Sequence, residues 1–234
     1  MPVLSIYLLP APESDFYRIG SALLGYDVYS GTHTRPLLAA QYGNDTMQAW
    51  IGIARLFGLH ATLGEAVSYA PHDLDELHAR MDWIASRTPP FALTNGRFHD
   101  SFALRPYSIT TTFDDPAGIV APLHQRIVTM VQVLYDTSPF FAPHLHTFAA
   151  ADRIAFYRYG APGYRILQNF SLHFSLASSF PDWRTRQQVH RAMLEETGLF
   201  CSATQRTLHI DALYMLEQQP DRHFRPVAAF PLRG

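Results

Sequence analysis

The sequence contains no lysine, and all 18 of its basic side chains are arginines. Against 20 acidic residues they give a formal net charge of −2. The chain therefore offers no global basic field that would hold a long nucleic acid. A small ligand, or one short stretch of a larger one, fits this charge balance better.

Cysteine and long apolar runs are also scarce. Cys201 is the only cysteine, which excludes an intramolecular disulfide framework. The apolar run over residues 3–9 lacks a basic lead and is too short for a signal peptide or a membrane span. No G-x-G-x-x-G segment and no P-loop sequence occurs, so a glycine-rich phosphate loop is not expected. We expect a cytoplasmic protein without a membrane segment, and its oligomeric state stays open.

Apolar residues are plentiful: 47% of the 234 residues are hydrophobic and 13% are aromatic, enough for a sizeable core. The patterns predict an α+β fold. Helices are expected from Ser14 to Leu24, from Pro71 to Ile84, over 116–135, and from Pro181 to near Gly198. Strands are expected over 3–9, 91–93, 98–104, 107–113, 153–159, 207–216 and 224–232. A hairpin turn is expected at Asn95-Gly96, and residues 26–48 are expected to form a long, mostly irregular loop.

Two short segments carry the same pattern, apolar–His–apolar–Ser/Thr–Leu. They are Leu59-His60-Ala61-Thr62-Leu63 and Leu172-His173-Phe174-Ser175-Leu176. Alternation with period 2 predicts β-strands in which every second side chain points to the same face. His60 and Thr62 should therefore share one face, as should His173 and Ser175, while the apolar residues line the buried side.

Small residues flank both His–hydroxyl pairs on the same faces. They are Gly58 and Gly64 in the first segment, and Ser171 and Ala177 in the second. A face that packs in a core would normally carry larger apolar residues, so we expect room for a ligand above both strands. One His-x-Thr/Ser segment alone is weak evidence, because structural histidines satisfied by hydrogen bonds would give the same pattern.

The two segments are followed by similar elements. A helix that begins with proline comes after each, at Pro71 and Pro181, and a pair of strands follows each helix. This repetition indicates an internal duplication. We expect one compact domain over residues 1–234, with pseudo-symmetric lobes at roughly 1–113 and 114–234, each built on an antiparallel sheet. The helix over 116–135 should bridge the halves, and a cleft should lie between them.

Paired histidines and hydroxyls suit the cleavage of a phosphodiester. A base must take a proton from the attacking oxygen, and an acid must give one to the leaving oxygen; histidine can do both. In-line attack requires the two imidazoles to flank the phosphorus. The hydroxyls of Thr62 and Ser175 can donate to the non-bridging oxygens. This chemistry calls for neither a metal ion nor a cofactor, and it predicts a bell-shaped pH–rate profile. The pattern does not tell which histidine is the base.

At these residues the chain resembles the 2H phosphoesterase superfamily (LigT-like), which is named for two His-x-Thr/Ser motifs. The resemblance is closer to one branch, the DUF1045 type, which is often encoded beside phosphonate-utilisation genes. The segments that carry this closer resemblance are Ile6–Pro12, Gly20–Gly31, Gly58–Leu63, Ile210–Tyr214 and Phe224–Leu232.

The resemblance implies a bilobal fold of two antiparallel sheets that enclose a cleft. It also implies that His60 and His173 are the acid–base pair and that Thr62 and Ser175 bind phosphate. The expected activity is hydrolysis of a small phosphodiester, in the first place a cyclic one, of nucleotide or ribose-phosphate type, with a link to phosphonate metabolism. The alternative is a non-catalytic module that binds a nucleotide or a phosphorylated RNA end; a purely structural scaffold would show buried histidines and no cleft.

Four further residues are candidates for lining the cleft. Tyr7 lies on the first strand, and Arg158, Tyr164 and Arg165 lie just upstream of the second motif. An arginine there can neutralise a second phosphate, although a solvated surface position is the commoner role for each arginine taken singly. For Tyr7 a place in the core is an equal alternative. His144-Leu145-His146 has two imidazoles at strand spacing, but no nearby cysteine or carboxylate cluster completes a metal site.

Overall fold

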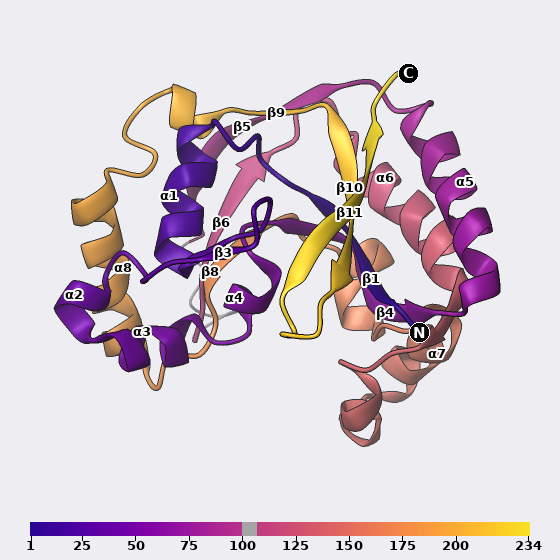
Figure 1. Ribbon diagram of the computed structural model, residues 1–234, viewed down its shortest axis with the longest axis horizontal. Coiled ribbons are helices and arrows are strands. Elements are labelled where there is room, and N and C mark those ends of the chain that lie inside the picture. Colours follow the sequence, from indigo (N-terminus) through magenta and orange to yellow (C-terminus); the bar gives the residue numbers. More distant parts are fainter. Residues whose placement is uncertain (100–106) are drawn as a thin grey trace.

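The computed structural model describes residues 1–99 and 107–234. A single curled antiparallel sheet runs through this part of the chain, with helices against both of its ends (Figure 1). Its strand order is β11-β10-β1-β4-β8-β6-β5-β9, and β7 pairs with β4 off this path. The strands are β1 (Val3–Leu8), β4 (Ala61–Tyr69), β5 (Phe91–Phe98), β6 (Ile109–Asp114), β7 (Tyr135–Thr137), β8 (Phe174–Ala177), β9 (Leu208–Ile210), β10 (Ala212–Gln218) and β11 (Phe224–Pro231). A separate small hairpin pairs β2 (Tyr26–Asp27) with β3 (Thr32–His33).

The expectation of two separate sheets was wrong. The halves β11-β10-β1-β4 and β8-β6-β5-β9 join at one residue pair, Ala61 with Phe174, into one sheet. Each of these residues directly follows a motif histidine, so the junction brings His60 and His173 to the middle of the sheet. Each half also combines strands from both sides of residue 113, because β10 and β11 lie beside β1 whereas β5 and β6 lie beside β8.

Eight α-helices and several short 3-10 or π segments occur in the described ranges. The α-helices are α1 (Asp15–Leu24), α2 (Ala39–Tyr42), α3 (Asn44–Ile51), α4 (Ala54–Phe57), α5 (Leu74–Ala85), α6 (Val120–Arg126), α7 (Ala150–Tyr159) and α8 (Trp183–Thr197). The shorter segments are η1 (Pro71–Asp73), η2 (Ile127–Val131), η3 (Gln132–Leu134), η4 (Ala142–Thr147), η5 (Gly163–Arg165), η6 (Leu167–Asn169) and η7 (Thr204–Arg206). No helix among the described residues is long and apolar enough to span a membrane.

Helix ends follow the predicted capping chemistry. The Ser14 hydroxyl accepts a hydrogen bond from the Tyr17 N–H at the start of α1, and Gly25 ends the helix with φ of 70°. Asp182 caps α8 by accepting bonds from two backbone N–H groups, and Gly198 ends it in the left-handed region. These interactions are local in sequence, which is why the predicted bounds of α1 and the predicted end of α8 near Gly198 were confirmed. α8 begins at Trp183, two residues after the predicted start at Pro181.

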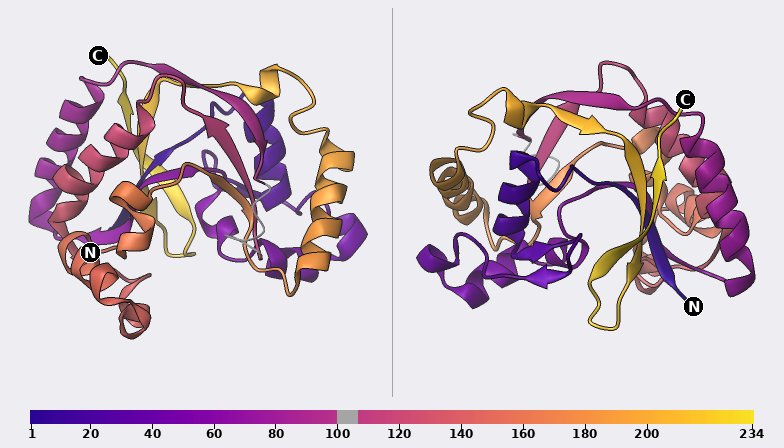
Figure 2. Two further views of the ribbon diagram at one scale, coloured as in Figure 1. Left: turned by 180° about the vertical axis from the view of Figure 1, so that it is seen from behind. Right: turned by 45° about the horizontal axis from the view of Figure 1, so that its top comes forward.

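The helices cover the two ends of the sheet separately. α5 and α6 lie beside the half that contains β1, β4, β10 and β11, whereas α1 and α8 lie at the other half (Figure 2). The helix predicted over 116–135 begins at Val120 and turns into the π segment η2, which packs on β4 and α5. It belongs to one half, so the expectation that it bridges the two was wrong.

Local predictions were also wrong at three places, which are Asn95-Gly96, 153–159 and 26–48. Asn95-Gly96 makes no hairpin turn: β5 runs through it with a register shift, where Asn95 has φ of 53°. A Cβ at Gly96 would come within 2.5 Å of Phe113. The glycine therefore allows close packing at an irregular position of the strand. The predicted strand 98–104 lies from residue 100 onward outside the described residues.

The segment 153–159, expected as a strand, lies in α7. Alanines at 149–151 favour a helix, and the buried residues Phe156 and Tyr159 have helical spacing, with Gly160 ending the helix at φ of 70°. The segment 26–48, expected as a loop, contains the β2–β3 hairpin, α2 and the start of α3. Tyr26 fixes this hairpin, because its buried hydroxyl donates to the Phe224 carbonyl over 2.8 Å.

Candidate active site

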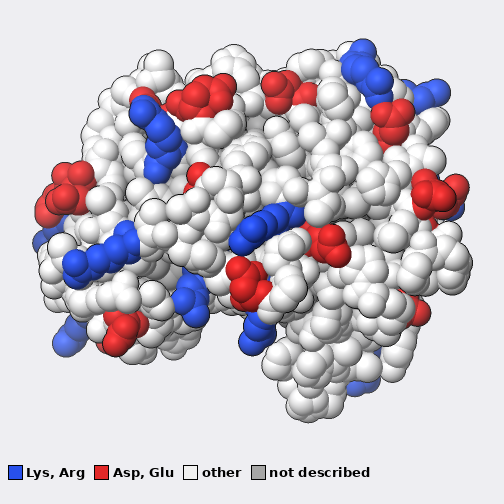
Figure 3. Space-filling view, in the orientation of Figure 1, with Lys and Arg blue, Asp and Glu red and all other residues white. Residues whose placement is uncertain are grey.

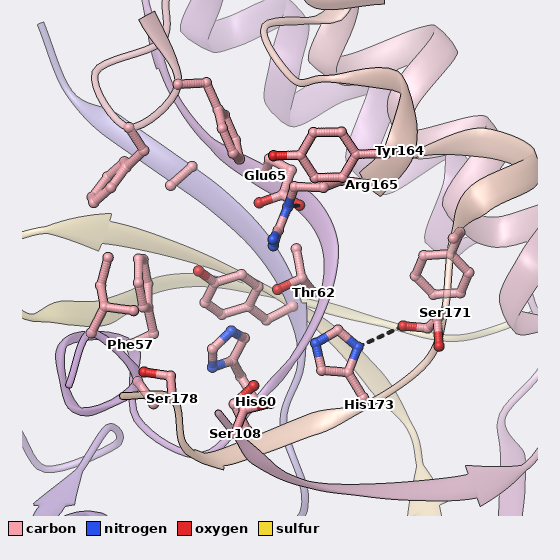
Figure 4. Close-up of a pocket in the computed structure, with 18 of the residues that line it drawn as sticks. Phe57, His60, Thr62, Glu65, Ser108, Tyr164, Arg165, Ser171, His173 and Ser178 are labelled. Carbon is pink, nitrogen blue, oxygen red and sulfur yellow. Dashed lines mark hydrogen bonds and ion pairs between the residues drawn. The ribbon is translucent and has the colours of Figure 1, made fainter. Parts of the chain in front are cut away.

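The two motif histidines are held in the same way. His60 Nδ1 lies 2.8 Å from the carbonyl oxygen of Gly58, and His173 Nδ1 lies 2.7 Å from that of Ser171. A carbonyl oxygen can only accept a hydrogen bond, so in both rings Nδ1 carries the proton and the lone pair of the neutral form resides on Nε2. Both histidines precede their strands by one residue and line one cavity of about 800 Å³ (Figure 4).

His60 lies in a largely apolar setting. Its ring stacks on buried Tyr7, with centroids 3.9 Å apart, and Phe57 lies 5.6 Å away. Burial disfavours the charged imidazolium and lowers the pKa of His60 to about 4, and the positive charge of Arg165 acts in the same direction. The hydrogen bond to Gly58 opposes this shift without cancelling it. His60 is therefore neutral at pH 7 and carries a lone pair that can accept a proton.

The predicted hydroxyls lie in the same cavity. Thr62 and Ser175 both line it, two residues after their histidines on β4 and β8. Thr62 lies opposite Tyr7 of β1, and Ser175 lies opposite Thr110 of β6. The strand alternation predicted from the sequence thus places two imidazoles and two hydroxyls around one space.

Gly64 does not leave room for a ligand, contrary to expectation. A Cβ at this position would lie 3.0 Å from Ile127 and 3.3 Å from Ile6, so the glycine permits close packing. The register of the two strands explains the change of face. Tyr7 pairs with Thr62, and Leu4 pairs with Val67. Between these two pairs β1 spans three residues, whereas β4 spans five. These two extra residues turn the strand, and Glu65 rather than residue 64 lines the cavity.

Glu65 forms an ion pair with Arg165 at the cavity wall. Arg165 Nε donates to Glu65 Oε1 over 2.7 Å, and the guanidinium also lies 5.5 Å from the centre of the Phe141 ring. Figure 4 shows the rest of the guanidinium pointing from this wall toward Thr62 and the two histidines. The nearby carboxylate raises the pKa of Arg165 further, which keeps it charged. The pair therefore presents a fixed cation whose charge is balanced by its neighbour.

Two buried side chains hold the irregular part of β4. Gln132 accepts from the Glu65 N–H over 3.0 Å and donates to the Tyr159 carbonyl over 2.7 Å. His124 donates from Nδ1 to the Leu63 carbonyl, and its Nε2 accepts from the Leu167 N–H, both over 2.8 Å. Each replaces a backbone bond that the irregular strand does not make. They also tie β4 to the segment that carries Arg165, so His124 has a structural role although it lines the cavity.

The other predicted residues divide into two groups. Tyr7, Tyr164 and Arg165 line the cavity, whereas Arg158 is exposed on α7 with its guanidinium 5.2 Å from the Tyr159 ring. Burial raises the pKa of the Tyr7 phenol, so it stays neutral beside His60. Sequence reasoning missed Glu65 and the aromatic part of the wall. That part comprises Phe57, Phe140, Phe141 and Phe170.

Comparisons with known proteins identify solved structures with a similar fold and a curated protein that matches over part of its length. No protein-family model matches the chain. The crystal structure of TT0787 from Thermus thermophilus aligns with a TM-score of 0.51 and 13% identity over 99% of this chain and 98% of that chain, so the two share a fold. E. coli LigT complexed with 3′-AMP aligns with a TM-score of 0.49 and 13% identity over 100% of both chains.

A curated protein from Laribacter hongkongensis (strain HLHK9), "Ribose 1,5-bisphosphate phosphokinase PhnN", is 25% identical over 194 residues. The match covers 80% of this chain and 43% of that protein. The chain therefore spans less than half the length of the curated relative it matches.

Proposed function

We propose that this chain is a phosphodiesterase of the 2H type, which hydrolyses a small cyclic phosphodiester of nucleotide or ribose-phosphate type. The observation that carries the proposal is the matched pair of Nδ1-to-carbonyl hydrogen bonds at His60 and His173. They fix the same tautomer in two rings of one cavity, which suits proton transfer at both ends of an in-line displacement. A site that only binds would not need two such groups.

His60 acts as the base in this mechanism and His173 as the acid. Neutral His60 takes a proton through Nε2 from a water molecule, whose oxygen attacks phosphorus. The bond from phosphorus to the leaving oxygen breaks, and protonated His173 gives its proton to that oxygen, leaving a phosphomonoester. Thr62 and Ser175 donate to the non-bridging oxygens, where negative charge develops. Both proton transfers are supplied by imidazoles, so the mechanism has no step that calls for a metal ion.

A phosphorylated ribose is the substrate class that we favour. The partial relative is named for ribose 1,5-bisphosphate; because this chain has no P-loop sequence, we carry over the phosphorylated sugar and not the kinase reaction. Arg165 supplies a cation at the cavity wall for a second phosphate. On the face seen in Figure 3, arginines and carboxylates are interspersed, which favours a small ligand over a long polyanion. A link to phosphonate metabolism and the DUF1045 branch belong to the same proposal.

Hydrolysis in the presence of EDTA tests the proposed function. The panel comprises 2′,3′-cyclic nucleotides, 3′,5′-cyclic nucleotides and ribose cyclic phosphates with and without a 5-phosphate. We expect turnover of at least one cyclic ester, with a phosphomonoester as product. Loss of activity in EDTA that returns with added metal would contradict the mechanism, and saturable binding without any turnover would instead establish a binding module.

The pH dependence of kcat/KM should reflect the low pKa of His60. The base form of a histidine is neutral, and the pKa of about 4 keeps His60 neutral well below pH 6. An ordinary histidine with a pKa of about 6.5 would be roughly 97% protonated at pH 5. We therefore expect kcat/KM, measured between pH 3.5 and 9, to follow a bell-shaped curve whose acidic side has an apparent pKa near 4.

The Arg165→Met variant provides the matched control for this profile. Because the Arg165 charge lowers the pKa of His60, its removal should move the acidic limb to higher pH. An acidic limb near pH 6.5 in the unaltered protein, or one that Arg165→Met moves downward, would contradict the role of His60 as the buried base.

A further inference from the structure

A second cluster of chemically active side chains lies outside the cavity. His33 of the β2–β3 hairpin meets Asp221 and His223 of the turn between β10 and β11, and none of the three lines the cavity. Their donor atoms all lie within 4.8 Å of one another. Asp221 Oδ2 lies between the rings, 3.8 Å from His33 Nε2 and 3.7 Å from His223 Nδ1. His223 Nδ1 also lies 3.2 Å from the Asp221 carbonyl oxygen, to which it donates a hydrogen bond, so a metal ion that binds this nitrogen replaces that bond.

These distances are close to those of a metal site. Two nitrogen or oxygen ligands of a tetrahedral Zn²⁺ lie about 3.4 Å apart when each is about 2.1 Å from the ion. The two distances to Asp221 Oδ2 exceed this value by only a few tenths of an ångström, so small rotations of the exposed His33 and Asp221 side chains suffice, whereas the His223 side chain is mostly buried. Two imidazoles and one carboxylate are also a donor set that suits Zn²⁺ and related transition metals.

The surrounding backbone already holds these donors together. Asp221 Oδ1 accepts a hydrogen bond from the His223 N–H over 3.0 Å, which orients the carboxylate and leaves Oδ2 toward the imidazoles. Between these residues Arg222 has φ of 71°, a left-handed conformation that folds the turn tightly. The donors on this side therefore come from a single ordered turn.

Tyr26 joins the two hairpins behind the cluster. Its ring lies 4.9 Å from that of His33 and 4.7 Å from that of His223, and the two imidazoles are 4.3 Å apart. Its hydroxyl donates to the Phe224 carbonyl, one residue after His223. The segments that carry the three donors are thus fixed to each other independently of any ion. Binding replaces the hydrogen bond of His223 Nδ1 to the Asp221 carbonyl and leaves these segments in place.

We propose that His33, Asp221 and His223 form a binding site for a divalent transition-metal ion of the Zn²⁺ class. Three protein ligands leave at least one coordination position for water. The ion cross-links the β2–β3 hairpin to the β10–β11 turn. Phe224, next to His223, stacks on Phe57 of the cavity wall at 4.7 Å, so the ion stiffens the support of that wall and takes no part in the proposed hydrolysis.

The charge of Arg225 predicts a direction of change in metal affinity that can be tested. Arg225 Nη2 lies 3.7 Å from Asp221 Oδ2, where it competes with a metal ion for the carboxylate and repels its charge. Replacing Arg225 with Gln should therefore tighten metal binding, whereas removing a ligand should weaken it. A surface histidine that binds metal by chance would not respond to Arg225 in this way.

Titration of the tag-free, chelator-treated protein with Zn²⁺ and Co²⁺ tests the site. We expect one ion per chain, a Co²⁺ visible spectrum typical of low coordination number, and a higher melting temperature. His33→Ala and Asp221→Asn should each weaken Zn²⁺ binding more than about tenfold, and Arg225→Gln should tighten it. His72→Ala is the matched control, because exposed His72 also lies beside a carboxylate, 3.6 Å from Asp73, without a third donor among the residues that the structure describes.

Two results would overturn the proposal. One is the absence of saturable 1:1 binding to the unaltered protein, a measurement that depends on no variant. The other is Zn²⁺ binding that His33→Ala leaves unchanged while the far-ultraviolet circular dichroism shows an intact fold. The metal site is tested by binding and melting temperature alone, without an activity measurement, so its failure and the failure of the proposed hydrolysis are separate outcomes.

Discussion

Replacing either His60 or His173 with Asn is expected to lower kcat for the cyclic phosphodiester about a thousandfold or more. Asparagine can place an N–H close to the position of Nδ1, so the bond to the carbonyl of Gly58 or Ser171 can be kept. What the variant loses is Nε2, the atom that moves the proton. The comparison therefore removes the chemistry while retaining the local backbone interaction, and single-turnover rates in EDTA measure it.

The double variant separates two ways in which these histidines can matter. Residues that act on one displacement as a unit lose activity non-additively, so the double variant should be little slower than the slower single variant. His72→Asn, at an exposed histidine outside the cavity, should leave kcat unchanged. If His60→Asn or His173→Asn retained more than about a tenth of the activity with an intact fold, the acid–base pair would be excluded.

The features that the sequence predicted well are those set by neighbouring residues. Ser14 and Gly25 mark the ends of α1 because a side-chain oxygen and a left-handed glycine act within one turn. Period-2 alternation likewise predicted that a histidine and a hydroxyl share a face at each motif. That both motifs line one cavity followed from their repetition, which suggested equivalent places in the fold.

The features that the sequence concealed depend on residues far apart in the chain. The two extra residues of β4 are stable because Gln132 and His124 take up the backbone groups that the irregularity frees. Nothing near Glu65 in the sequence announces this, so strict alternation pointed to Gly64 as the next cavity residue. The same distance hid the partnership of Glu65 with Arg165, and only the sequence position of Arg165 upstream of the second motif indicated its place.

The sheet topology was concealed for a similar reason. The duplication pattern suggested that each half of the chain builds its own sheet, yet β10 pairs with β1 and β5 pairs with β9. Edge strands exposed by such halves would present unpaired backbone groups. Exchange of strands between the halves, together with the pair Ala61–Phe174, joins them into one sheet.

Arg165→Met is expected to weaken binding selectively for substrates that carry a second phosphate. A hydrogen bond to a charged group contributes about 1.5–3 kcal/mol, which corresponds to roughly 10- to 150-fold in KM. The same variant should change KM little for the cyclic ester that lacks the second phosphate. Methionine retains much of the unbranched apolar stem that packs near Phe141 while removing the charge. The ratio of KM for the substrate with the second phosphate to KM for the substrate without it measures this effect, because a general loss of binding changes both values alike.

Glu65→Gln should act in the opposite direction. The amide oxygen can still accept from Arg165 Nε, so the guanidinium keeps its place, but the neutralising charge is gone. A doubly phosphorylated substrate should therefore bind more tightly, and the KM ratio should shift opposite to that of Arg165→Met. Arg158→Met is the matched control, because Arg158 lies on the preceding helix outside the cavity. Equal losses for both substrates, or equal effects of Arg158→Met and Arg165→Met, would show that Arg165 has a structural role and selects no second phosphate.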